Sequence, residues 1–280
     1  MKSRTWLITG VSSGFGREMT EQLLEKGDRV IGTVRNREKV TNLINTYPET
    51  FTCGILDVTD VSTIQKLVDN SFNKFNKIDV VVSNAGYGLF GAAEELSDAE
   101  IDHIIATNLT GSMQLIKSAL PYMRKQGGGR IIQLSSYGGQ VAFPGNSMYH
   151  ATKWGIEGFC EAVAQEVKPF NIGMTIVEPG GARTEFRYSS AKVARLMPEY
   201  DGNPAHNFLN MLDASKGLAA GDPSRMAAHI IESVDKNPAP LRMVLGSQAL
   251  ASTITTLKNR VADYETQTEL AASTDFPVGE

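Results

Sequence analysis

The sequence predicts an α/β protein with a doubly wound parallel sheet, Rossmann-like, of about seven strands with helices on both faces. Short apolar runs alternate along the chain with longer stretches in which apolar residues recur every three or four positions. The short runs lack strict alternation of apolar and polar residues, which is typical of parallel strands covered on both faces. A glycine-rich turn joins the first run to the first helical stretch, as in doubly wound nucleotide-binding folds.

The elements can be assigned in chain order. The runs predicted to be strands are 5–9, 29–34, 51–56, 78–83, 130–135, 172–178 and 241–245. Helices are predicted from Gly14 to Gly27, over 61–75, over 97–123 and over 147–167. Ser97 and Glu100 form a capping box at the start of the third helix.

Two segments do not follow the strand–helix pattern. Residues 184–221 separate two predicted strands and are too long for an ordinary connection, so they are expected to be a lid or substrate loop, with a core subdomain as the alternative. Residues 248–280 are expected to be an extension made of a polar helix, 248–270, and a short tail. The whole chain, 1–280, is predicted to be a single domain.

Composition excludes several classes of protein. The net charge of −4 gives no reason to expect a nucleic acid partner. Cys53 and Cys160 match no metal-ligand spacing, and we expect reduced thiols in a cytoplasmic protein. No apolar run is long enough for a membrane helix, and no spacing among the histidines predicts a metal site. His150 is expected to be a packing or surface residue.

The glycine-rich turn is a candidate phosphate site. Residues 9–16 read TGVSSGFG and lie between a predicted strand and a predicted helix. Glycines allow backbone amides to approach a pyrophosphate, and the helix N-terminus presents free N–H groups to the anion. The alternative is a tight turn without a ligand.

The end of the second predicted strand indicates which dinucleotide binds. An NAD-binding protein would place a carboxylate there, on the ribose 2′-hydroxyl. This chain has Arg35 and Arg37 instead, and a guanidinium suits a 2′-phosphate. We therefore predict NADP(H), with two solvated surface arginines as the alternative.

A candidate catalytic group lies on the 147–167 helix. Tyr149 and Lys153 are four residues apart and share a helix face, where the ammonium would lower the pKa of the phenol. The phenol could then act as a general acid or base. Ser136 follows a strand at the ligand-binding edge of the sheet and could bind a substrate oxygen. Asn108 lies in the middle of a helix, where an irregularity that frees its carbonyl would give it a purpose; an incidental polar residue is the alternative.

These residues together resemble the classical short-chain dehydrogenase/reductase family over about residues 3–246. Residues 9–16 match its TGxxxGxG motif, 84–86 its NAG motif, and 179–184 its PGxxxT segment. The resemblance implies a catalytic tetrad of Asn108, Ser136, Tyr149 and Lys153. It implies cofactor contacts from Gly10, Ser12, Ser13, Phe15, Gly16, Arg35, Asp57, Val58, Asn84, Ala85, Gly86, Tyr149, Lys153, Pro179, Gly180 and Thr184.

Within that family the chain is most similar to the branch around type-1 17β-hydroxysteroid dehydrogenase and related carbonyl reductases. The sequence departs from many NADP-preferring members at Ser13, where they carry a basic residue, so the prediction of NADP(H) depends mainly on Arg35. The resemblance also implies a homo-oligomer, a dimer or a tetramer, paired through the helices near 97–123 and 147–167.

The substrate is expected to be a small apolar ketone, aldehyde or secondary alcohol. Besides Ser136 and Tyr149, the expected substrate contacts are Phe90, Phe143 and Phe186, because an apolar pocket with a few polar groups is the usual form of such a site. The alternative is that these rings are core residues. The predicted function is therefore NADP(H)-dependent hydride transfer. The alternative hypotheses are a redox-sensing regulator without turnover and a sugar-nucleotide epimerase.

Overall fold

The computed structural model describes residues 3–188, 190–213, 215 and 217–276. Its main sheet has seven strands, all parallel, in the order β3-β2-β1-β4-β6-β7-β9. The strands are β1 (Thr5–Thr9), β2 (Arg29–Val34), β3 (Phe51–Ile55), β4 (Val80–Ser83), β6 (Gly129–Leu134), β7 (Ile172–Pro179) and β9 (Arg242–Leu245). The predicted fold class is confirmed.

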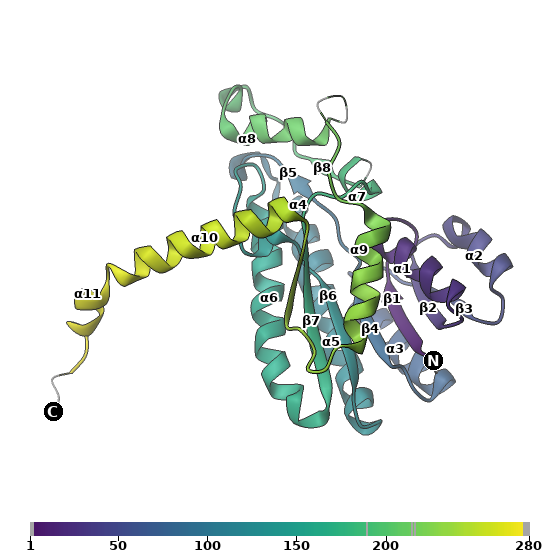
Figure 1. Ribbon diagram of the computed structural model, residues 1–280. Helices are drawn as coiled ribbons and strands as arrows, with labels where there is room; N and C mark the ends of the chain where they lie inside the picture. The colour runs from purple at the N-terminus through teal and green to yellow at the C-terminus, as the bar shows by residue number, and fades with distance from the viewer. Residues whose placement is uncertain (1–2, 189, 214, 216, 277–280) are drawn as a thin grey trace.

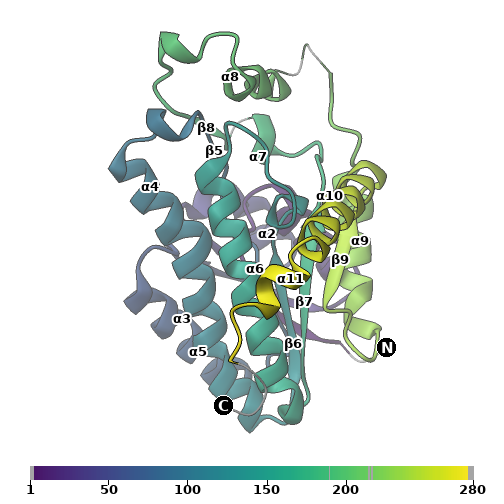
Figure 2. The ribbon, with the colours of Figure 1, turned by 90° about the vertical axis from the view of Figure 1, so that its left-hand side faces the viewer.

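Helices cover both faces of this sheet. The described chain forms α1 (Gly14–Glu25), α2 (Thr41–Thr46), α3 (Val61–Phe75), α4 (Asp98–Ile104), α5 (Gly111–Lys125), α6 (Ser147–Val167), α7 (Glu185–Tyr188), α8 (Pro204–Phe208), α9 (Pro223–Glu232), α10 (Ser247–Glu265) and α11 (Thr268–Ala272). Helices α3, α5 and α6 lie side by side on one face (Figure 2), and α1 and α9 pack on the other.

Alternate side chains of each strand belong to different cores. Leu7, Val81 and Ile131 pack with α3, α5 and α6, whereas Ile8 and Val82 pack with α1 and α9. Both faces of the central strands are therefore buried, which explains why these runs are apolar without alternation.

The helices over 61–75 and 147–167 have the predicted bounds. The expected 97–123 helix is instead three pieces, because a π-helical turn over Ile105–Thr110 separates α4 from α5, which ends at Lys125. The capping box of Ser97 and Glu100 is confirmed. The turn places Asn108 in an irregular stretch, as expected.

Helix α9 was not among the predicted helices. Its sequence signals are nevertheless present, since Asp222 caps the backbone N–H groups of Ser224 and Arg225, and Pro223 occupies the first turn. Within the described chain, no helix is long and apolar enough to cross a membrane.

The segment over 184–221 lies above the carboxyl ends of the strands (Figure 1). It contains α7, α8 and β8 (Lys192–Val193), which pairs in parallel with β5 (Leu89–Phe90). Of this segment, residues 189, 214 and 216 lie outside the described residues, as do the last four residues of the expected C-terminal extension.

The C-terminal extension differs from the expected polar helix. Its main helix, α10, ends at Glu265, and α11 follows after a break. Helix α10 projects away from the body of the molecule (Figure 1) and exposes a row of large apolar side chains. The helix is polar in its overall composition, but it has one apolar face, which the sequence prediction missed.

Candidate active site

A pocket of about 560 Å³ opens at the carboxyl ends of the central strands. Its walls come from the β1–α1 turn, from the residues after β2, β3, β4, β6 and β7, and from the 184–221 segment above them. This edge of the sheet is where doubly wound folds bind ligands. All of the predicted site residues line this pocket except Gly16 and Asn108.

The β1–α1 turn forms one end of the pocket. Gly10 and Gly14 have positive φ angles of 75° and 57°, which glycine adopts without strain. The Asn84 side chain donates hydrogen bonds to the carbonyl oxygens of Thr9 (2.8 Å) and Gly10 (3.1 Å), and so it fixes the turn from the β4 side.

Gly16, in the first turn of α1, packs directly against the β1–α1 turn. A Cβ atom at Gly16 would lie 2.2 Å from the Gly10 carbonyl oxygen and 2.5 Å from Asn84 Nδ2. Gly16 thus allows α1 to approach the turn closely, which agrees with its absence from the pocket wall.

Charged residues border the pocket after β2 and β3. Arg35 is exposed at the end of β2, and Lys39, which was not among the predicted site residues, also lines the pocket. Asp57 accepts hydrogen bonds from the Thr59 amide (2.9 Å) and hydroxyl (2.7 Å). These bonds from Thr59, together with the charge of Arg35, lower the pKa of Asp57, which keeps it ionised.

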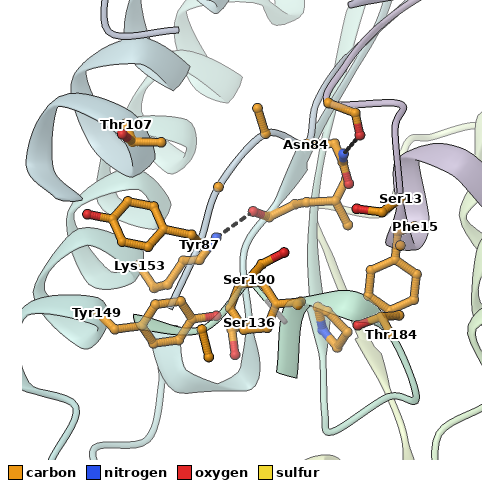
Figure 3. A pocket seen from close by; sticks show the side chains of 18 of the residues that line it. Ser13, Phe15, Asn84, Tyr87, Thr107, Ser136, Tyr149, Lys153, Thr184 and Ser190 are labelled. Carbon is orange, nitrogen blue, oxygen red and sulfur yellow. Dashed lines mark hydrogen bonds between the residues drawn. The ribbon is translucent and has the colours of Figure 1, made fainter. Parts of the chain in front are cut away.

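Ser136, Tyr149 and Lys153 meet at the other end (Figure 3). Ser136 Oγ accepts from the Gly138 amide (3.0 Å) and hydrogen-bonds the Tyr149 phenol. Lys153 is buried, and its ammonium donates to the Leu134 carbonyl oxygen (2.9 Å). The figure places Ser13, Phe15 and Thr184 across the pocket from these three side chains.

The pKa of Tyr149 is shifted upward, whereas the neighbouring Lys153 was expected to lower it. Burial raises the pKa of Tyr149 to about 12, although the Ser136 hydrogen bond opposes the shift. Burial also lowers the pKa of Lys153 to about 8. The Lys153 nitrogen lies 5.7 Å from the centre of the Tyr149 ring and points at Leu134, so desolvation outweighs its effect on the phenol. In this structure the phenol therefore keeps its proton at neutral pH.

Asn108 supports the pocket from behind. Its Oδ1 atom accepts from the Tyr87 amide (3.0 Å), and its Nδ2 atom donates to the Tyr87 carbonyl (2.8 Å). A Cβ at Gly86 would lie 3.1 Å from Asn108 Oδ1. The Asn108 side chain thus positions the loop after β4. It does not line the pocket itself, but the loop residues that it holds do.

The predicted substrate residues form an aromatic wall. Phe90, Phe143 and Phe186 all line the pocket. The Phe186 ring lies 5.8 Å from that of Tyr149, and Phe143 stacks on Phe208 at 5.5 Å. The contribution of Phe208 was missed, because it comes from α8, some sixty residues along the chain from Phe143.

His150 is another residue whose role the sequence did not disclose. Its Nδ1 atom lies 2.7 Å from the Gly138 carbonyl oxygen, and its Nε2 atom accepts from the Phe143 amide (3.0 Å). These partners assign a neutral ring that donates at Nδ1. Burial lowers the pKa of His150, which favours the same form. His150 therefore ties the loop that carries Ser136 to the loop that carries Phe143.

A buried charge cluster lies one helical turn beyond Lys153. Glu157 accepts from the Ser135 hydroxyl and from the Gln140 amide (2.5 Å). Arg242 binds both Glu157 and Glu178, whose side chains are 2% and 1% exposed. Burial, followed by the charge of Glu157, raises the pKa of Glu178. Among the described residues no group of side chains could hold a metal ion.

Comparison with known proteins agrees with this architecture. The family model for short chain dehydrogenases matches residues 4–194. The oxidoreductase BOA17 of Botryotinia fuckeliana is 36% identical over 89% of this chain and 90% of its own length. A short-chain dehydrogenase structure from Streptomyces avermitilis superposes with a TM-score of 0.91 at 35% identity, covering 99% of this chain and 100% of the other.

A third match carries a nucleotide. The structure of ElxO with NADP bound superposes with a TM-score of 0.71 at 26% identity, covering 87% of this chain and 98% of that one. The family model alone covers more than half of the chain, and it includes both the glycine-rich turn and the Ser136–Tyr149–Lys153 group. The chain therefore belongs to the short-chain dehydrogenase family and is an oxidoreductase of that family.

Proposed function

We propose that the protein transfers a hydride between NADP(H) and an apolar ketone, aldehyde or secondary alcohol. The observation that carries this proposal is the meeting of Ser136, Tyr149 and Lys153 in the same pocket as the β1–α1 turn. A proton donor and a phosphate-binding turn in one pocket suit a reaction that moves a hydride and a proton together.

The pocket residues fit the nucleotide. At Gly10 a Cβ would lie 3.1 Å from Ala85 Cα, so glycine lets this turn pack closely against the residues after β4, and the turn leads into the N-terminus of α1, where a pyrophosphate would bind. Arg35 and Lys39 place positive charge at the end of β2, where the 2′-phosphate would lie. The NADP bound to ElxO supports the same cofactor here. When bound, the cofactor supplies the hydride.

The protein's own groups handle the proton and the substrate oxygen. Ser136 and Tyr149 bind that oxygen. Because the phenol holds its proton at neutral pH, Tyr149 acts as the general acid in carbonyl reduction. Lys153 would hold the cofactor ribose, and its ammonium lies 5.7 Å from the centre of the Tyr149 ring. Asn108 acts as a positioning residue through Tyr87.

The aromatic wall supports an apolar substrate. Phe90, Phe143 and Phe186 give the pocket an apolar surface close to Tyr149, which suits an apolar substrate. This composition agrees with the carbonyl-reductase branch around type-1 17β-hydroxysteroid dehydrogenase. The 184–221 segment is the lid over this wall, within a single domain, and the free thiols of Cys53 and Cys160 suit a cytoplasmic protein.

The deciding experiment measures NADPH oxidation across a panel of apolar ketones and aldehydes. We expect turnover with at least one apolar carbonyl compound and with no sugar nucleotide. NADPH binding without turnover on the whole panel would favour a redox-sensing regulator instead. Turnover confined to nucleotide sugars would favour an epimerase.

A further inference from the structure

Residues 135–140, the serine loop, carry Ser136 from the end of β6 toward α6. The middle of this loop is a short 3-10 helix over Tyr137–Gly139. Side chains of α6 hold it at one point, because the Gly138 carbonyl oxygen lies 2.7 Å from His150 Nδ1 and accepts from Trp154 Nε1 (3.0 Å). These bonds fix the middle of the serine loop, and its two ends depend on other contacts.

The carboxylate of Glu157 joins the two ends of the serine loop. Its Oε1 atom accepts from the hydroxyl of Ser135, the residue before Ser136. Its Oε2 atom accepts from the side-chain amide of Gln140 (2.5 Å), the last residue of the loop. Glu157 is buried and lies on α6, the helix that carries Tyr149. One carboxylate therefore ties both ends of the loop to the helix that supplies the phenol.

The Glu157 carboxylate is itself fixed in place. A Cβ atom at Gly139 would overlap Glu157 Oε1, so a side chain at this position would displace the carboxylate. Arg242 donates to Glu157 Oε2 (2.6 Å) and offsets the charge of the buried group. A carboxylate held by a cation and packed against the loop backbone can set the position of that loop.

We propose that Glu157 is a positioning residue for Ser136, and that its carboxylate places the Ser136 hydroxyl beside the Tyr149 phenol by holding both ends of the serine loop. Ser136 Oγ is hydrogen-bonded to the Gly138 amide (3.0 Å) and to that phenol, so a displaced loop would change where a substrate oxygen binds. This inference rests on the proposed function, in which the two hydroxyls bind that oxygen. Glu157 itself does not line the pocket.

Two substitutions release the loop and leave the charge of Glu157 in place. Ser135→Ala and Gln140→Ala each remove one hydrogen bond to its carboxylate, and the combined variant keeps the ion pair with Arg242. The kcat of the combined variant for ketone reduction should fall about 10- to 100-fold, because a shift of about 1 Å near a catalytic group can have an effect of this size. The KM for NADPH should change little, since both side chains point at Glu157.

Glu161→Gln is the matched control. Glu161 lies one helical turn beyond Glu157 and also pairs with Arg242 (2.8 Å), but within the described chain its carboxylate has no hydrogen bond to the serine loop. The control variant weakens the same charge cluster, so it separates a loss of stability from a loss of position. Its kcat should equal that of the wild type. Circular dichroism should show an unchanged fold in every variant.

A mutant cycle with Ser136→Ala shows whether the effect passes through Ser136. Loss of this hydroxyl should itself lower kcat by about 10²- to 10³-fold, the usual cost of losing a donor to a developing oxyanion. If Glu157 acts by placing that hydroxyl, the two loop substitutions should lower kcat no further once Ser136 is Ala. A purely structural role of Glu157 would instead multiply the two effects.

Trp154 reports the position of the loop without turnover. Its indole Nε1 donates to the Gly138 carbonyl oxygen, and the residue is 41% exposed, whereas Trp6, the second tryptophan, is fully buried. Iodide in solution should therefore quench the fluorescence of Trp154 selectively. The Stern–Volmer quenching constant should be higher in the combined variant than in the wild type, and unchanged in Glu161→Gln.

Four results would overturn the proposal: an unchanged kcat in the combined variant, an equal loss of kcat in Glu161→Gln, a further loss of kcat on the Ser136→Ala background, or an unchanged quenching constant in the combined variant. A wild type without turnover on any apolar carbonyl compound would contradict the proposed function instead. The quenching measurement would then still decide whether Glu157 holds the serine loop.

Discussion

His206 Nε2 lies 2.6 Å from Glu95 Oε1, although 111 residues separate them in the chain. Glu95 is buried, and it also accepts from the backbone amides of Met197 (2.7 Å) and Ala92 (2.6 Å). One carboxylate therefore joins two points of the 184–221 segment to the turn before α4. This contact fixes the segment above the pocket.

The strength of that contact should depend on pH. The hydrogen bond to Glu95 raises the pKa of His206, and Asp201 acts in the same direction. A raised pKa means that the folded protein favours the protonated ring. The stabilisation is full below the ordinary histidine value of about 6.5 and is lost as the pH rises through the raised value.

We therefore expect His206→Ala to increase the rate of tryptic cleavage after the exposed Arg195, relative to the wild type at the same pH. The ratio of the cleavage rate of the variant to that of the wild type should be larger at pH 6 than at pH 9. His229→Ala is the control, because His229 pairs with Glu232 on α9, away from the segment. Equal ratios at both pH values would show that the ion pair does not hold the segment.

Arg35 should set the choice of cofactor. A charge-assisted contact with the 2′-phosphate is worth roughly 1.5–3 kcal/mol, so we expect a preference for NADPH over NADH of about 10- to 150-fold in kcat/KM. Arg35→Ala should remove most of this preference. Arg37 does not line the pocket, so the Arg37→Ala variant should keep the preference for NADPH. Equal kcat/KM for the two cofactors in the wild type would contradict the assignment.

Tyr149→Phe tests proton transfer directly. The variant loses only a hydroxyl, so it should fold and bind NADPH with nearly unchanged affinity, as measured by cofactor fluorescence. Its kcat should fall by about 10²- to 10⁴-fold or more, the usual contribution of a general acid. A kcat near the wild-type value would mean that the Tyr149–Lys153 pair is structural.

Arg242 should contribute strongly to stability. Replacing it by Gln leaves the buried carboxylates of Glu157 and Glu178 without their cation, which typically costs about 3–5 kcal/mol. Burial already raises the pKa of Glu178, and a carboxyl with a raised pKa destabilises the fold more as the pH rises above its ordinary value. The loss should therefore be larger at pH 8 than at pH 5.

Urea unfolding of Arg242→Gln at both pH values measures this loss. Arg4→Gln provides the comparison, since its ion pair with Asp235 is largely exposed and should contribute about 1 kcal/mol or less. If both variants lose the same free energy, the cluster around Arg242 gives no special stability.

Much of the fold was predictable because its signals are local. Apolar periodicity fixed the bounds of α3 and α6, and the capping box at Ser97 marked the start of α4. The pocket residues were predictable because loops after parallel strands reach one edge of the sheet, so motifs far apart in sequence converge there. A polar residue in mid-helix suggested an irregularity at Asn108, and the structure has a π-helical turn there.

Tertiary structure alone decided what depends on burial and on contacts between distant segments. The direction of the Tyr149 pKa shift follows from desolvation, which no spacing of Tyr and Lys reveals. The roles of His150 and Glu95 follow from partners on other loops. The row of exposed apolar side chains on α10 was not predicted, because most residues of this helix are polar. Their exposure follows from the direction in which α10 leaves the body of the molecule, which only the tertiary structure shows.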